Sequence, residues 1–172
     1  MSDFSNTNSH DVSAVVSALT GDAITPQMAE RYDRRAQINA LEAHMMAADE
    51  SVKLDIASIT FHHFASGVYC REMRLPQGYV LVGKIHKTEN MSVLLKGAIR
   101  VTTETGTVEL HAPQIMVSTP GSKRVGYALE DTIWLSLHAV GDERDLDKIE
   151  AQFIAPSFDE LEPAHNLTEI AQ

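Results

Sequence analysis

Short runs of alternating hydrophobic and polar residues fill the middle of the chain, from about residue 52 to residue 140. The run Val68–Leu75 is typical, because apolar and polar side chains alternate along it and Gly67 and Pro76 bound it. A period of two residues indicates a β-strand with one buried face. Roughly nine such runs, with no helical pattern between them, predict an antiparallel β-sandwich or a closed barrel.

Helical spacing appears before this region. A stripe of apolar residues at every third or fourth position predicts a helix over residues 26 to 49, with Thr25 as its cap. The stripe comprises Ile38, Leu41, Met45 and Ala48. We expect the helix to pack on the barrel, or at an oligomer contact, through this stripe, which leaves Glu30, Arg34 and Arg35 on its solvated face.

Helical spacing returns after the strands, where Leu146, Ile149 and Phe153 share one face and Pro156 follows. The predicted organisation is therefore one domain with extensions at both ends. Its segments are a mobile N-terminal tail with a short helix (1–24), a helix (25–50), a barrel (51–141), and a C-terminal helix with an acidic extension (142–172).

Composition and charge exclude several classes of protein. The 172 residues include 24 acidic and 14 basic side chains, for a net charge of -10, which disfavours binding to nucleic acid. The single cysteine, Cys70, cannot form an internal disulfide or a thiolate metal cluster, which fits a reducing compartment. No stretch has the apolar length of a membrane span or the pattern of a secretory signal, so we expect a soluble cytoplasmic protein with no membrane partner.

The stretch from Gly78 to His138 carries a family resemblance. Gly78 and Gly97 frame a strand pair, and Thr119-Pro-Gly-Ser-Lys-Arg124 precedes the apolar run Ile133–His138. This order resembles the two sequence blocks of the cupin superfamily. The resemblance implies a mainly β fold, the cupin-like double-stranded β-helix or jelly-roll barrel, here with N-terminal and C-terminal helical extensions.

The same resemblance implies where a metal would bind in a typical cupin. The two histidine positions of the first block are Lys84 and His86 here, the glutamate position is Asn90, and the histidine position of the second block is Arg124. Only His86 keeps a metal-ligand side chain, and two of the replacements are cations that repel a divalent metal. We therefore expect no metal or other cofactor.

The four residues at these positions suit a different ligand. Lys84, His86, Asn90 and Arg124 would line one end of the barrel as hydrogen-bond donors, suited to a carboxylate or phosphate on a small anionic ligand. Two alternatives stay open. Lys84 and Arg124 pair with acidic residues such as Glu109 or Glu89 and the barrel is only a scaffold, or His86 joins a rearranged metal-ligand set with His63, His111 or His138.

A narrower resemblance covers roughly residues 60 to 155. The run Lys123–Trp134, then Leu137-His138 and Glu143–Glu150, is similar to small cupin-like proteins of tailed bacteriophages. This implies a viral protein made in the bacterial cytoplasm. The resulting hypothesis is a non-catalytic, homo-oligomeric binding or assembly protein, either a virion component or an accessory factor that binds a host protein or a small anion. The alternative is a metal-dependent cupin enzyme of the isomerase or dioxygenase type that uses His86.

Overall fold

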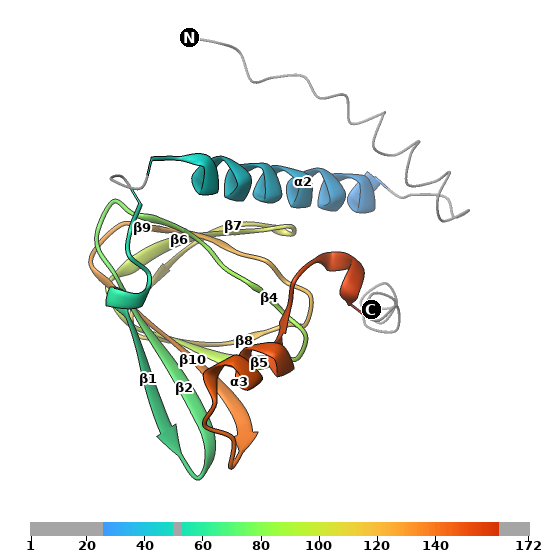
Figure 1. Ribbon diagram of the computed structural model, residues 1–172. Helices are drawn as coiled ribbons and strands as arrows, with labels where there is room; N and C mark the ends of the chain where they lie inside the picture. Colours follow the sequence, from blue (N-terminus) through green and yellow to red (C-terminus); the bar gives the residue numbers. More distant parts are fainter. Residues whose placement is uncertain (1–25, 50–52, 162–172) are drawn as a thin grey trace.

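Two antiparallel β-sheets face each other in the computed structural model, which describes residues 26–49 and 53–161 (Figure 1). The five-stranded sheet has the order β1-β2-β10-β5-β8. Its strands are β1 (Thr60–Ala65), β2 (Gly67–Leu75), β5 (Asn90–Lys96), β8 (Gln114–Ser118) and β10 (Thr132–Gly141). The four-stranded sheet has the order β3-β9-β6-β7. Its strands are β3 (Val80–Val82), β6 (Ala98–Thr103), β7 (Gly106–His111) and β9 (Val125–Ala128).

The order of the strands is that of a jelly roll. Without the two-residue strand β4 (Ile85–His86), eight strands follow one another from β2 to β10. One sheet contains the first, eighth, third and sixth of them, and the other contains the second, seventh, fourth and fifth. This interleaving of early with late strands is the double Greek key of a jelly-roll barrel. The predicted fold class is confirmed, and β1 adds a fifth strand at one edge.

Helices flank the barrel at both ends of the described chain. They are α2 (Pro26–Ala47), η2 (Ala57–Ile59), α3 (Leu146–Phe153) and η3 (Phe158–Glu160). The Asp145 side chain caps α3 by accepting the backbone N–H of Asp147 at 3.0 Å. After α3, the short strand β11 (Ile154–Ala155) pairs with β4 and ties this helix to the barrel. No helix within the described residues combines the length and the apolar composition of a transmembrane segment. The predicted tail over residues 1–24 lies outside the described residues.

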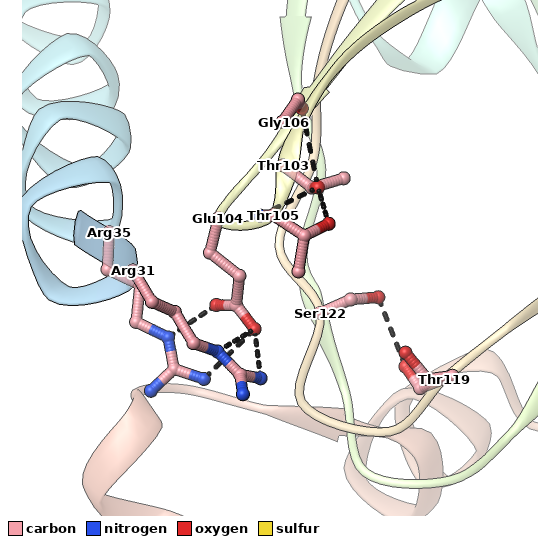
Figure 2. Close-up of polar contacts among 8 residues, drawn as sticks. All are labelled: Arg31, Arg35, Thr103, Glu104, Thr105, Gly106, Thr119 and Ser122. Atoms are coloured by element: carbon pink, nitrogen blue, oxygen red, sulfur yellow. Dashed lines mark hydrogen bonds and ion pairs between the residues drawn. The ribbon is translucent and has the colours of Figure 1, made fainter. Parts of the chain in front are cut away.

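Ionic contacts hold α2 on the barrel together with Ile38 of the predicted apolar stripe. Ile38 is its buried residue, whereas Leu41 of the stripe is exposed. Figure 2 shows the guanidinium groups of Arg31 and Arg35 directed at the carboxylate of Glu104, in the turn between β6 and β7. The placement of Arg35 on a solvated face is therefore wrong. The Glu104 side chain is only 3% exposed, and a desolvated carboxylate requires cationic partners.

A second contact of α2 lies on the loop before β9. The Nζ atom of Lys123 donates to Glu42 Oε2 at 2.5 Å and to Asn39 Oδ1 at 3.1 Å. Lys123 is itself buried, so its charge is also balanced by the helix. The described part of α2 is thus attached by charge pairs at two separate loops of the barrel.

The apolar core fills one end of the barrel. Leu75 and Leu94 from the five-stranded sheet meet Ile99, Val101 and Ala128 from the four-stranded sheet, and all five are buried. A separate cluster joins α3 to the five-stranded sheet. It consists of Tyr69, Val140, Ile149 and Phe153. The space between these two clusters is where polar side chains enter the barrel.

Candidate functional site

Polar side chains line the barrel between the two apolar clusters. Every second residue of a strand points inward, and the register of the five-stranded sheet places Arg71 beside Ser136 and Ser136 beside Ser92. Ser92 and Ser136 are buried, as are Asn90 and Ser118, which are paired in register one row away. The interior is therefore polar toward the α3 end and apolar toward the other.

The structure brings together two of the predicted site residues directly. His86 lies on β4 and Asn90 begins β5, and His86 Nδ1 is 2.8 Å from Asn90 Oδ1. Asn90 is only 5% exposed and contacts His86 without lining the cavity, and its Nδ2 atom has no hydrogen-bond partner among the described residues. Asn90 therefore orients the His86 imidazole without itself lining the cavity.

Arg124 enters the same interior from the loop before β9. Its Nη1 atom donates to Ser118 Oγ at 2.7 Å, and that hydroxyl is 2.9 Å from Ser92 Oγ. Burial lowers the pKa of the Arg124 guanidinium from its ordinary value, but an arginine stays charged at neutral pH. The hydroxyl groups of Ser118 and Ser92 are neutral, so the positive charge of Arg124 has no anionic partner among the described residues.

Lys84 differs from the other three predicted residues. Its side chain is 49% exposed, and Nζ donates to Glu150 Oε1 on α3 at 2.5 Å. Neither of the expected partners, Glu89 and Glu109, forms this ion pair. Glu109 pairs instead with Arg100 on the outside of the barrel. Lys84 thus stands at the mouth of the interior with its charge balanced by α3.

Sequence reasoning missed Arg71, which the structure places at the centre of the site. Arg71 is on β2, and its Nε atom is buried without a hydrogen-bond partner in the described part of the chain. A signal was present in the sequence. Arg71 is in phase with Tyr69, Met73 and Leu75, which are all buried, so a charged residue occupies an inward-facing position.

His138 is the second residue whose role was not predicted. It is only 7% exposed, and its ring lies edge-on to that of His86 with 5.3 Å between centroids. Burial, with His86 and Arg71 nearby, lowers the pKa of His138 to about 4. Burial also lowers the pKa of His86. Both imidazoles are therefore neutral at pH 7, and the positive charge of the interior comes from the arginines.

Two cavities meet at this polar region. The barrel cavity has a volume of about 90 Å³, and most of its wall is apolar. Its apolar lining includes Met73, Leu75, Leu81, Ile99, Val101 and Trp134, and its polar lining includes Arg71, Lys84, His86, Ser122, Arg124 and Ser136. The outer cavity has a volume of about 310 Å³ and lies between α3, β2 and η2. Arg71, Met73, Lys84 and His86 line both. The two cavities therefore share one polar junction.

The side chains at this junction do not fit a divalent metal. Within the described residues, no group of three His, Cys, Asp or Glu side chains is placed to hold one. His86 Nδ1 is engaged by Asn90, and the positive charges of Arg71 and Arg124 face the same space. Of the other histidines considered, His63 points outward to Glu72 at 2.8 Å and His111 is exposed on β7.

Comparison with known proteins gives a likeness of fold. No protein-family model matches the chain, and no curated protein matches its sequence. A cupin superfamily protein from Desulfitobacterium hafniense is 10% identical, with 54% of this chain and 94% of that chain covered and a TM-score of 0.42. A cupin-2 domain protein from Shewanella frigidimarina is 8% identical, with 58% and 92% covered and a TM-score of 0.40. The EutQ protein of Clostridium difficile is 14% identical, with 55% and 74% covered and a TM-score of 0.41.

The fold is a jelly-roll barrel. The evidence is the strand order of the two sheets, which matches that of a jelly roll at each of its eight strands. Similarity at the level of these solved structures does not extend to a ligand or a reaction. The function therefore has to be argued from the side chains of the site.

Proposed function

We propose that this protein is a non-catalytic binding protein that holds the anionic group of a small ligand in the polar end of its barrel. The proposal rests on two arginines, Arg71 and Arg124. Both line the barrel cavity, and neither forms an ion pair in the described part of the chain. Partial burial of a guanidinium group without an anionic partner is unfavourable, and a bound carboxylate or phosphate would offset that cost.

The rest of the lining supports binding of an anion. Ser136 adds a hydroxyl that can donate to the anion, whereas the Ser122 hydroxyl already donates to the Thr119 carbonyl at 3.0 Å. The neutral His86 ring directs its Nδ1–H at Asn90 and adds no donor. Among the described residues, the one carboxylate that lines either cavity is Glu150 in the outer cavity, which is 53% exposed and engaged by Lys84. An anion entering the barrel would therefore meet the two guanidinium groups, the Ser136 hydroxyl and, within the described residues, no unpaired carboxylate.

Binding of acetate and of inorganic phosphate to the purified protein tests this proposal by isothermal titration calorimetry. Arg71→Gln is expected to weaken binding of the bound anion by at least about tenfold, because it removes a charge-assisted contact. Arg100→Gln is the matched control, since Arg100 is exposed and pairs with Glu109 outside the barrel. Equal affinity in all three proteins, or no binding to the wild type, would refute the proposal.

The metal-dependent enzyme is the second candidate, and the same samples distinguish it. It requires stoichiometric metal in the purified protein, lost on His86→Ala and measured by inductively coupled plasma mass spectrometry. The positive charges of Arg71 and Arg124 at the junction favour the anion. A retained metal that depends on His86 would reverse that preference.

We further propose that the protein is a homodimer, joined through the apolar outer face of the five-stranded sheet. The apolar part of this face lies on β5, β8 and β10, beside the Arg74–Glu72 ion pair of β2, and consists of Met91, Val93, Leu95, Ile115, Val117, Leu135 and Leu137. Met91, Leu95, Ile115 and Val117 are 48 to 71% exposed. All seven side chains are uncharged on a chain of net charge -10, so a second copy can approach here without repulsion between facing residues.

Replacing Ile115 and Val117 together with lysine is expected to convert a dimer into a monomer of 18.9 kDa. Two buried ammonium groups facing two others would outweigh the apolar contact. Size-exclusion chromatography with light scattering measures the mass. Val108→Lys is the control, because Val108 is 51% exposed on the other sheet. A wild-type monomer, or a double variant that stays dimeric, would contradict this interface. The phage resemblance adds a prediction that the oligomer contacts a host or virion protein.

A further inference from the structure

The hydrogen bond between His86 and Asn90 fixes which ring nitrogen carries the proton. The Nδ1 atom of His86 lies 2.8 Å from the Oδ1 atom of Asn90. An amide oxygen only accepts hydrogen bonds, so Nδ1 carries the proton and donates it. A neutral imidazole has one N–H group, and the Nε2 atom of His86 therefore keeps a lone pair and accepts.

The surroundings of His86 keep this lone pair available. Burial is the main cause that lowers the pKa of His86, the hydrogen bond to Asn90 raises it, and the charges of Arg71 and Arg124 lower it further. The ring is therefore neutral at pH 7, and both guanidinium groups lie close enough to act on it. The Nε2 atom forms no hydrogen bond to a described residue, and water can reach it, unlike the enclosed Nδ1 atom of His138.

The other polar side chains of the barrel cavity can all donate hydrogen bonds. Arg71, Lys84 and Arg124 only donate. The hydroxyl groups of Ser122, Thr132 and Ser136 can donate or accept. Among the described residues of this lining, His86 Nε2 is thus the one side-chain nitrogen or oxygen that accepts and cannot donate. An anion without a proton of its own would satisfy the arginines and leave this nitrogen unpaired.

We infer that the ligand is an oxyanion with a hydroxyl group, on the oxyanion itself or on the neighbouring carbon, and that His86 Nε2 accepts the hydrogen bond of this hydroxyl. A small 2-hydroxycarboxylate and hydrogen phosphate share this chemistry. Both are small enough to consider for a cavity of about 90 Å³, since a water molecule occupies about 30 Å³ in the liquid. The inference rests on the proposed anion binding and goes beyond it, because the arginines alone would not select for a hydroxyl group.

Calorimetric titration with two matched pairs of anions, at pH 7 and one ionic strength, tests the inference. Glycolate and propionate differ by a hydroxyl in place of a methyl group, and phosphate differs from sulfate by the proton that it keeps at this pH. The wild type is expected to bind the hydroxyl-bearing member of a bound pair at least about fivefold more tightly, because the other member leaves Nε2 without a partner.

His86→Phe keeps an aromatic ring and removes the acceptor. This variant is expected to reduce the preference to less than about twofold, while the affinity for propionate or sulfate changes by less than about threefold. His111→Phe is the matched control, since His111 is exposed on β7 and lines neither cavity. Circular dichroism verifies the fold of both variants.

Long-range proton–nitrogen correlation spectra of the imidazoles give a second readout on the wild type without ligand. They are expected to show the His86 proton on Nδ1 and a bare Nε2. Equal affinity within each bound pair, or a proton on Nε2, would overturn the inference and leave anion binding intact. A preference that survives His86→Phe would also overturn it, because another group would then receive the hydroxyl. No binding of any of the four anions would overturn the proposed function as well.

Discussion

Replacing Arg124 with methionine is expected to stabilise the ligand-free protein and to abolish its stabilisation by a bound acid. Arg124 is half-buried, and its donated hydrogen bond goes to a neutral hydroxyl on Ser118. A methionine of similar length removes a cation that has no anionic partner among the described residues, so the ligand-free protein is expected to gain stability, by about 1 kcal/mol, from the lower cost of desolvation. Ser118 keeps its contact with Ser92, so no hydroxyl is left without a partner.

The measurement is thermal unfolding without ligand and with whichever of acetate or phosphate binds the wild type. At a ligand concentration of about 100 times Kd, the wild type is expected to gain about 2.7 kcal/mol, and the variant to gain almost none. Arg100→Met is the control, because Arg100 is exposed and is expected to change neither value by more than about 0.5 kcal/mol. If Arg124→Met lowers the stability of the ligand-free protein, Arg124 is a structural residue and the anion site loses one of its two cations.

Replacing Glu104 with glutamine is expected to be the most destabilising conservative change outside the apolar core. Glu104 accepts hydrogen bonds from both Arg31 and Arg35, and its side chain is 3% exposed. Removing one partner from a buried charge cluster costs about 3 to 5 kcal/mol. The loss is expected to release α2 from the turn between β6 and β7.

Urea unfolding followed by circular dichroism measures this loss. Glu109→Gln is the matched control, because the Arg100–Glu109 pair is about half exposed on both sides and is expected to contribute less than about 1 kcal/mol. A similar small effect for both variants would show that α2 is held by other contacts, such as those of Lys123 with Glu42 and Asn39.

The sequence was informative wherever the signal was local. Alternation with a period of two predicts the strands, and helical spacing predicts α2 and α3, because both periods follow from backbone geometry. His86 and Asn90 are four residues apart and were both assigned to one site, and their contact at 2.8 Å lies within a single turn of chain. The ligand-binding roles of Lys84, His86, Asn90 and Arg124 stay predictions.

The sequence was least informative where long-range pairing decides the outcome. The partner of Lys84 is Glu150, 66 residues away, and the partners of Glu104 on α2 are about 70 residues away. Contacts between residues so far apart along the chain leave no periodic pattern in a single sequence. The attachment of α2 was predicted from its apolar stripe, whereas desolvation of Glu104 makes charge pairing the stronger requirement.

The alternation along β5 and β10 shows what each level determines. The sequence alone determines that Met91, Val93 and Leu95 share one face and that Asn90 and Ser92 share the other, because side chains alternate across a strand. Only the tertiary structure decides which face lies inside. Here the barrel encloses the face of Asn90 and Ser92, which also carries the core residue Leu94, and leaves the face of Met91, Val93 and Leu95 outside. Because the two sheets close into a barrel, Arg71 of β2 and Arg124 of the loop before β9 line the same cavity. Their shared position, which no local sequence pattern determines, makes this cavity the candidate anion site.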